Sequence, residues 1–273
     1  MSLQDIKRRV VITGAAGRIG KRLTTHLADS RSYDLVLVDR DARGEAGIHS
    51  ADLSRYDAKW TDLFAGADTV IHLAGDPRPT APWLSVAENN IEATLHLFRA
   101  ASEHKVGRVI YASTLMTMEG HRFGSGPITA DTPARPTCFY AASKLMAESI
   151  GRQFSQVTGM SVISLRVGAV QVDRSSPSRD VNAWRRTKWL SGDDLCQAFE
   201  KAILAGFSGF VILPLVSDND GMRWDLTDTC RVIGYEPTKP GPTDPTYLHV
   251  RIRGVLGYLH KRLFDTGWRD YWP

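Results

Sequence analysis

The sequence has few residues of the kinds that hold metal ions or form disulfide networks. Its 273 residues include three cysteines, Cys138, Cys196 and Cys230, which are widely spaced and cannot all pair. Neither these nor the eight histidines follow a metal-ligand spacing. We therefore expect no metal site, and a protein of the reducing cytoplasm.

Long apolar runs and a strong excess of one charge are also missing. No apolar stretch approaches the ~18 residues that a membrane helix needs. The first expected strand begins so early that we expect no secretory signal before it. The net charge of +4 is too small and diffuse to indicate nucleic acid binding. We expect a cytoplasmic protein with neither a membrane nor a nucleic acid as its partner.

The first two thirds of the chain alternate short β-rich runs with longer amphipathic segments. This alternation predicts a Rossmann-type α/β fold, in which a doubly wound parallel sheet has helices on both faces. Apolar runs such as LVLVD and VIYA are typical of strands buried on both faces. We expect strands at Val10–Thr13, Leu35–Asp39, near Ile48, Thr69–Leu73, Val109–Ala112, Val162–Val167 and Phe210–Leu213, and helices at Ile19–Ala28, Ala58–Leu63, Leu84–Ser102 and Phe139–Gln156.

The organisation changes near residue 170. We expect residues 1–170 to form the Rossmann core and residues 171–273 to form a mixed segment with a small substrate lobe. That segment includes the returning strand near 210–213 and a C-terminal helix in the basic stretch Tyr247–Phe264. Ser191-Gly-Asp-Asp194 has the spacing of a capping box, which predicts a helix start with Asp194 reaching back to the cap.

Glycine recurs at every third position in VVITGAAGRIG, at Gly14, Gly17 and Gly20. A glycine-rich turn between a strand and a helix lets the backbone approach a pyrophosphate, and the helix N-terminus offers it free N–H groups. A tight turn without a ligand is the alternative for glycine repeats alone. The strand before and the helix after this loop favour a dinucleotide site that includes Arg18 and Ile19.

A carboxylate indicates which dinucleotide to expect. Asp39 ends the second expected strand about 20 residues past the glycines, where it would meet the adenine ribose hydroxyls. It would repel the extra phosphate of NADP, so we expect NAD. Arg40 and Arg18 could reach that phosphate, which keeps NADP as the weaker alternative.

Tyr140 and Lys144 are four residues apart in an expected helix and share one face. A free phenol has a pKa of about 10 and is a poor base at neutral pH. An ammonium at ~4 Å contributes on the order of 4 kcal/mol at an effective dielectric of about 20, or roughly three pKa units. We expect Lys144 to lower the pKa of Tyr140 and make it a proton acceptor. A chance match in an amphipathic helix is the alternative.

These motifs resemble those of the extended short-chain dehydrogenases/reductases, the NAD-dependent epimerase/dehydratase family, over about residues 9–170. The pair Ser113-Thr114 after the fifth expected strand is part of the resemblance. It implies an NAD-dependent oxidoreductase acting on a small molecule. Thr114 would hold the substrate oxygen, with Ser113 as the fallback, while Tyr140 takes the proton and hydride leaves for the nicotinamide.

The resemblance implies further cofactor residues. Asp52-Leu53 is similar to the pair that contacts adenine, although Asp52 could instead be a helix cap. Leu73-Ala74-Gly75 is similar to the loop that lines the cofactor. Asn90 matches an asparagine that supports the active site, with a polar surface residue as the alternative.

Within this family, the sequence most resembles the uronate dehydrogenases, which oxidise hexuronic acids at C1. Shared features are GAAG-x-x-G, Pro82-Trp83, Arg166-Val-Gly168 and Trp189-Leu-Ser-Gly-Asp-Asp194, with a looser match at Gly234-Tyr235-Glu-Pro237. The resemblance also implies a homodimer that packs through the helices expected at 84–102 and 139–156.

The sequence departs from the uronate dehydrogenases around the substrate. Leu115-Met116 replaces the Asn-His that holds the sugar, and Trp184 falls where the carboxylate-binding arginine is expected. Arg185 is then the candidate carboxylate anchor, against a solvated arginine, and a less polar substrate stays open. Two other functions also stay open: an epimerase with tightly bound NAD, and a regulator that binds the dinucleotide without chemistry.

Overall fold

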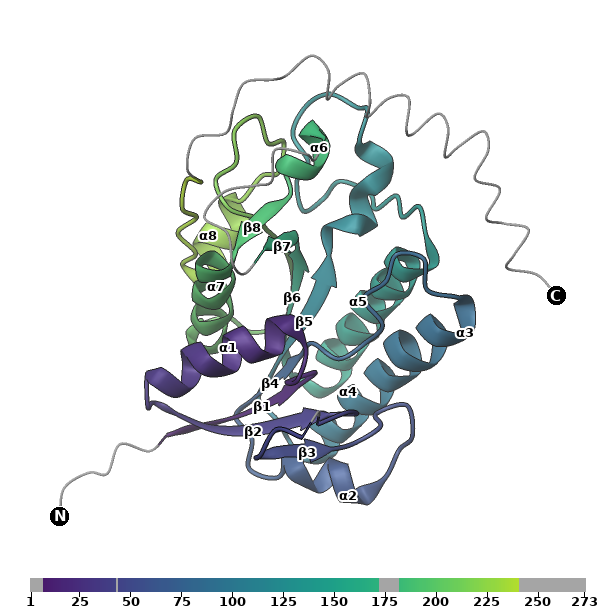
Figure 1. Ribbon diagram of the computed structural model, residues 1–273, viewed down its shortest axis with the longest axis vertical. Coiled ribbons are helices and arrows are strands. Elements are labelled where there is room, and N and C mark those ends of the chain that lie inside the picture. Colours follow the sequence, from purple (N-terminus) through teal and green to yellow (C-terminus); the bar gives the residue numbers. More distant parts are fainter. Residues whose placement is uncertain (1–6, 43, 172–181, 241–273) are drawn as a thin grey trace.

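The computed structural model describes residues 7–42, 44–171 and 182–240, so the helix expected at Tyr247–Phe264 lies outside the described residues. A parallel sheet of seven strands forms the centre of the fold, in the order β3-β2-β1-β4-β5-β6-β9 (Figure 1). This confirms the predicted fold class. The strands are β1 (Arg8–Thr13), β2 (Tyr33–Asp39), β3 (Ile48–Ser50), β4 (Thr69–His72), β5 (Arg108–Thr114), β6 (Ser161–Val167) and β9 (Phe210–Leu215).

The order of the strands reverses between β1 and β4, which pair in parallel from Val10 opposite Thr69 to Thr13 opposite His72. The chain builds β2 and β3 on one side of β1, then crosses to build β4, β5, β6 and β9 on the other. Connections leave opposite faces of the sheet at such a point, and ligands bind there beyond the carboxyl ends of the strands.

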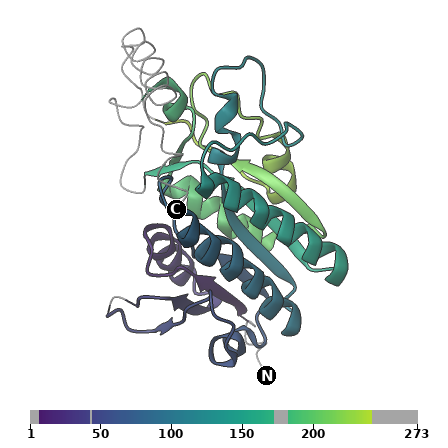
Figure 2. The same ribbon diagram turned by 90° about the vertical axis from the view of Figure 1, so that its right-hand side faces the viewer.

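Helices cover both faces of the sheet (Figures 1 and 2). One face carries α1 (Arg18–Asp29), α7 (Gly192–Leu204) and α8 (Thr227–Ile233), and the other carries α2 (Ala58–Thr61), α4 (Ala93–Glu103) and α5 (Phe139–Thr158). Because side chains alternate along a strand, β1 supplies both cores: Ile12 packs in one and Val11 in the other. In the described part of the chain, no helix is both long and apolar enough to cross a membrane.

The helix expected at Leu84–Ser102 is present but irregular. It begins as α3 (Trp83–Val86), passes through a π-turn at Ala87–Glu92 and continues as α4. Apolar periodicity predicts such a helix but does not reveal a wider turn inside it. Two 3₁₀ helices, Asp62–Phe64 and Leu115–His121, also extend the expected pattern.

A second, two-stranded sheet was not predicted. β7 (Ala169–Gln171) and β8 (Trp189–Ser191) pair in parallel, and the short α6 (Ala183–Arg186) precedes β8. Three-residue strands carry too little local pattern to be predicted, because their pairing depends on distant partners. They bring residues 182–191 beside the end of β6. β9 belongs to the later part of the chain but pairs with β6 in the main sheet. The division of the chain into two parts at residue 170 stays a prediction.

The start of α7 confirms half of the expected capping box. Ser191 Oγ accepts a hydrogen bond from Asp194 N at 2.9 Å, as a cap should. The Asp194 carboxylate does not return to the Ser191 amide, which donates to Ser217 Oγ instead. It accepts from Ser217 Oγ and from Thr238 Oγ1. Asp194 therefore ties the start of α7 to two later segments of the chain.

Candidate active site

A cleft of about 1520 Å³ runs along the carboxyl ends of the strands, from the glycine loop to α6. Its position at the switch point is the one expected of a dinucleotide site. Nearly all the residues predicted for the site line this cleft: Gly14, Gly17, Arg18, Ile19, Gly20, Asp39, Arg40, Asp52, Leu53, Leu73, Ala74, Gly75, Ser113, Thr114, Tyr140, Lys144 and Arg185. Within the described ranges, no group of His, Cys, Asp or Glu is arranged to hold a metal ion.

The glycine loop has the close packing that a pyrophosphate site needs. Gly14 has a φ of +73°, and a Cβ there would lie 2.7 Å from the backbone nitrogen of Ala74. A Cβ on Gly20 would lie 2.3 Å from Gly14 O. Gly17 precedes α1 without a side-chain cap, and the first turn of α1 contains no acidic residue. The N–H groups of this helix end are therefore open to an anion, so the loop fits a dinucleotide.

Asp39 lies at the end of β2, against the glycine loop. Its Oδ2 accepts a hydrogen bond from Ala16 N at 2.9 Å, and its Oδ1 accepts from Asp41 N at 3.2 Å. Each carboxylate oxygen can accept further bonds, so the ribose role expected of Asp39 fits. Arg40 donates to Asn89 Oδ1 at 2.7 Å across the cleft. The arrangement fits NAD, whose ribose carries no added phosphate.

The structure decides two alternatives left open by the sequence, Asp52 as a helix cap and Asn90 as a surface residue. Asp57, not Asp52, caps α2, because it accepts from Lys59 N at 2.9 Å. Asp52 accepts from Ser54 N and Oγ in its own turn and faces the cleft. Asn90 is fully buried and is therefore no surface residue.

Asn90 lies behind the cleft and is not among the residues that line it, so its assignment as a cofactor contact stays a prediction. Its Oδ1 accepts from Asp76 N at 2.7 Å, and its Nδ2 donates to Asp76 O and to Ser143 Oγ, each at 3.1 Å. A Cβ on Gly75 would lie 2.8 Å from Asn90 Oδ1. From the π-turn, Asn90 thus fixes the loop after β4 against α5, and the loop itself borders the cleft.

The predicted catalytic groups converge where β5 meets the first turns of α5. Thr114 ends β5 and lies near enough to the Tyr140 phenol to lower the pKa of that phenol. Lys144 is buried on the same face of α5, and its Nζ donates to Ala112 O at 2.9 Å. The Ser113 hydroxyl turns away and donates to Glu148 Oε1 at 2.6 Å. Thr114 rather than Ser113 is therefore the hydroxyl beside Tyr140.

The expectation that Lys144 lowers the pKa of Tyr140 is wrong. Burial raises the pKa of Tyr140 to about 12, and the nearby Thr114 hydroxyl only partly opposes this. Burial also lowers the pKa of Lys144 to about 8, against the attraction of Glu148. Both groups lose hydration, and the ammonium turns to Ala112 O. Sequence spacing gives the shared face but not the cost of burial.

Leu115 and Met116 line the end of the cleft beyond Thr114, where the substrate is expected. Glu119 accepts a hydrogen bond from Trp184 Nε1 at 3.0 Å and forms an ion pair of 2.5 Å with Lys188 Nζ. All three side chains line the cleft. Glu119 and Lys188 were not predicted, because the 3₁₀ helix and β8 that bring them together have no sequence signature.

Arg185 is exposed on α6 and also lines this end of the cleft. Its backbone N–H donates to Asn182 Oδ1, which caps α6. The side chain stands one residue past Trp184, on the rim, while Lys188 lies deeper and is nearly buried. The structure thus brings a second cation to the end where the sequence offered Arg185.

Comparison with known proteins agrees with this geometry. The family model described as NAD dependent epimerase/dehydratase family matches residues 10–202. An NAD-dependent glucose-6-phosphate dehydrogenase of Haloferax volcanii is 33% identical over 252 residues, 84% of this chain and 92% of that protein. A uronate dehydrogenase of Pseudomonas putida is 31% identical over 56% of this chain and 54% of its own length.

Solved structures of uronate dehydrogenases are also similar to this chain. The crystal structure of a mutant uronate dehydrogenase from Agrobacterium tumefaciens, in complex with NAD, has a TM-score of 0.73 and 25% identity, over 88% of this chain and 92% of that one. The predicted cofactor, NAD, is confirmed by the family and by this complex. The predicted resemblance is confirmed as well: the chain belongs to the NAD dependent epimerase/dehydratase family.

Proposed function

We propose that the protein is a cytoplasmic, NAD-dependent sugar dehydrogenase that oxidises the C1 hydroxyl of a cyclic sugar, with Tyr140 as the base. The observation that supports this most is the placement of Thr114, Tyr140 and Lys144 together on the wall of the dinucleotide cleft. The names of the relatives also favour it, since these proteins are dehydrogenases of glucose 6-phosphate, L-arabinose and uronate.

The hydroxyls of Thr114 and Tyr140 would hold one substrate oxygen between them. Thr114 orients that oxygen, and Tyr140 accepts its proton. When bound, NAD accepts the hydride and adds the positive charge of its nicotinamide ring. Because the pKa of Tyr140 is about 12 in the free protein, the phenolate needs a positive surrounding. Lys144, which stays protonated below about pH 8, supplies the part of that charge that belongs to the chain.

We propose that the sugar carries an anionic substituent, a carboxylate or a phosphate. Lys188, Arg185 and Arg122 line the proposed substrate end beside the Glu119 carboxylate. Burial lowers the pKa of Lys188, Glu119 opposes this, and the charges of Arg122 and Arg185 lower it further. An anion placed among these cations would relieve their repulsion, so Arg185 and Lys188 are its proposed anchors.

The test is a panel of uronic acids, sugar phosphates and neutral aldoses with NAD and with NADP, read as reduced cofactor formed. Tyr140→Phe should remove the signal by a factor of roughly 10² or more. Tyr33→Phe is the control, because Tyr33 is the first residue of β2 and lies at the amino ends of the strands, away from the cleft at their carboxyl ends. Interconversion of sugars without net NADH would favour the epimerase, and cofactor binding without any turnover would favour the regulator.

We also propose a homodimer that packs through α4 and α5. These helices lie side by side on one face (Figure 1), where Leu95 of α4 and Met146 of α5 are nearly half exposed. A second copy would bury these side chains. The mass of the parent protein by light scattering tests this, with a Leu95→Arg/Met146→Arg variant expected to be monomeric.

A further inference from the structure

Three charged side chains are buried together behind the proposed catalytic groups. Glu148 follows Lys144 by one turn of α5, and Arg166 reaches it from β6. Their exposed fractions are 5% for Lys144, 2% for Glu148 and 6% for Arg166. Two buried cations thus share one buried carboxylate, and buried charges are costly unless they are paired.

Both oxygens of the Glu148 carboxylate accept hydrogen bonds. Its Oε1 accepts from Ser113 Oγ at 2.6 Å and from Arg166 Nε at 2.9 Å, and its Oε2 accepts from Arg166 Nη2 at 2.8 Å. Ser113 and Arg166 are register partners on β5 and β6. The carboxylate is therefore locked beneath the strand end that carries the Lys144 acceptor, Ala112 O, and the hydroxyl of Thr114.

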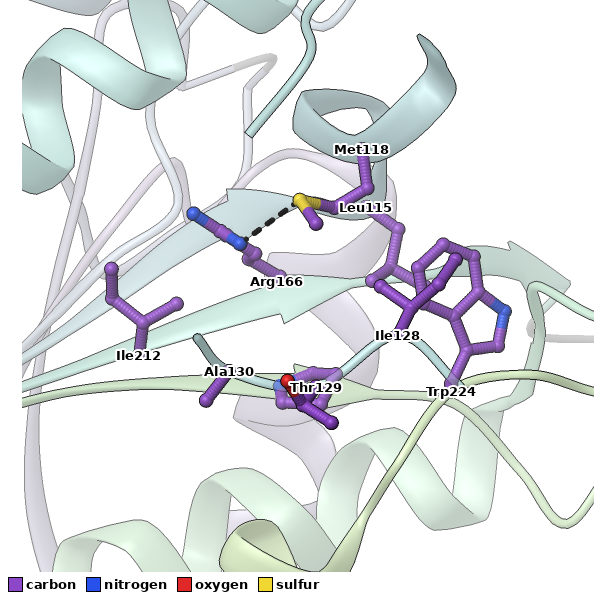
Figure 3. A pocket seen from close by; sticks show the side chains of 9 residues that line it. Leu115, Met118, Ile128, Thr129, Ala130, Arg166, Ile212 and Trp224 are labelled. Carbon is purple, nitrogen blue, oxygen red and sulfur yellow. Dashed lines mark hydrogen bonds between the residues drawn. The ribbon is translucent and has the colours of Figure 1, made fainter. Parts of the chain in front are cut away.

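Arg166 has a weak partner on its other side. Its Nη1 donates to Met118 Sδ at 3.1 Å, as Figure 3 shows, and a thioether is a weak acceptor. Most of the hydrogen bonding that stabilises the buried guanidinium therefore comes from Glu148. Glu148 attracts two cations. Arg166 is bonded to it and cannot lose its proton, whereas Lys144 feels its charge and can lose its proton.

The other groups that face Lys144 are neutral near pH 7. Tyr111 of β5 places its ring 4.8 Å from Nζ, and burial raises its pKa well above the usual value. His72 of β4 is fully buried, which lowers its pKa to about 3, with Lys144 adding to the effect. Tyr140 on α5 is protonated as well. Among these groups, Glu148 is the anion that favours the charged form of Lys144.

We propose that Glu148 is a positioning residue that sets the proton occupancy of Lys144, and that Arg166 limits how strongly it does so. Without Glu148, two unpaired cations would face each other, and Lys144 would release its proton more easily. Without Arg166, the whole charge of Glu148 would act on Lys144, which would hold its proton more tightly. The two changes should thus act in opposite directions.

The effect on catalysis depends on the proposed function, in which charged Lys144 supports Tyr140, but the titration itself does not. The probe is the NMR signal of ¹³C-labelled lysine, with Lys144 assigned by its absence in Lys144→Met. We expect a midpoint near pH 8 in the parent. It should fall by about one pH unit in Glu148→Gln and rise in Arg166→Gln.

Ser113→Ala is the matched control, because it removes a neutral hydrogen bond from the same carboxylate oxygen and should leave the midpoint in place. Unchanged midpoints, or shifts of both variants in the same direction, would overturn the proposal. If the single variants do not fold, Glu148→Gln/Arg166→Met removes both members of the Glu148–Arg166 ion pair at once, which is less damaging than removing one of them. Its midpoint should lie below that of the parent, and a midpoint equal to the parent's would overturn the proposal.

The kcat profile separates positioning from mere structural support. The pH at which kcat falls on the alkaline side should be lower in Glu148→Gln and higher in Arg166→Gln, in step with the titration of Lys144. A structural role would lower kcat by the same factor at every pH. If the parent reduces NAD with none of the sugars, the proposed function fails, while the lysine titration still decides the role of Glu148.

Discussion

The ammonium of Lys144 donates a hydrogen bond to the carbonyl oxygen of Ala112 at 2.9 Å. This bond connects α5 to the last residues of strand β5, just before Thr114. The two elements that carry the proposed base and the proposed oxygen-holding hydroxyl are thereby fixed relative to each other. Such a fixed arrangement of the proposed groups is what preorganised catalysis requires.

The close approach at Gly14 can be separated from its backbone strain. Gly14 and Gly44 have nearly equal positive φ values, +73° and +72°, but only a Cβ on Gly14 would meet other atoms within 4 Å. Gly44→Ala should cost about 1–2 kcal/mol of stability from strain alone and leave NAD binding unchanged. Gly14→Ala should cost more and weaken NAD binding. Urea unfolding and NAD titration calorimetry measure both, and equal effects would contradict the close-approach argument.

Asn90 should matter for stability more than the asparagine before it. Asn90→Ala leaves the amide and the carbonyl of Asp76 without their buried partner, which should cost roughly 1–3 kcal/mol. Asn89→Ala is the matched control, since Asn89 is only partly buried and its side chain bonds Arg40 at the cleft. Unfolding in urea compares the two. A smaller loss in Asn90→Ala than in Asn89→Ala would refute this role of Asn90.

The proposed anion anchor makes a prediction about substrate choice. Arg185→Ala should raise the KM for acidic sugars by roughly tenfold, the equivalent of one lost charged contact of about 1.4 kcal/mol, and should leave neutral sugars unaffected. Arg186→Ala is the neighbouring control, because Arg186 does not line the cleft. Steady-state kinetics on both substrate classes decide the matter. An unchanged KM for every acidic substrate would remove Arg185 from the site.

Acid should destabilise the protein through His72. Its ring nitrogens contact the hydroxyls of Thr13 and Thr94 at 2.7 and 3.1 Å, and burial lowers its pKa from 6.5 to about 3. The unfolded chain binds the proton first, so stability is full above pH 6.5 and falls as the pH drops toward 3. The slope is about 1.4 kcal/mol per pH unit from this group.

The free energy of unfolding measured between pH 4 and 7 tests this contribution. His72→Gln should flatten the slope in that window. The exposed His49, exchanged in the same way, is the matched control. Identical slopes in the parent and in His72→Gln would show that His72 does not set this acid sensitivity.

Short-range sequence patterns were sufficient to predict the parts of the site that form within one local stretch of the chain. The glycine loop, Asp39 and the Tyr140–Lys144 pair each depend on spacing within one strand–turn–helix unit or one helix. The pairing of β7 with β8, the contact between Glu119 and Lys188, and the cluster around Glu148 join segments far apart in the sequence. The sign of the Tyr140 shift likewise depends on burial, which spacing does not encode.

The π-turn at Ala87–Glu92 separates two demands on one helix. A π-turn accommodates an extra residue and lets the following turns keep their orientation, so Leu97 and Phe98 stay fully buried in the core. Deleting one residue of the turn would restore a regular helix and preserve that core. The same deletion would withdraw the Asn90 amide from the loop after β4. Such a shortened protein would remain folded while losing the support of its cofactor loop, so at this point evolution can alter the site without altering the scaffold.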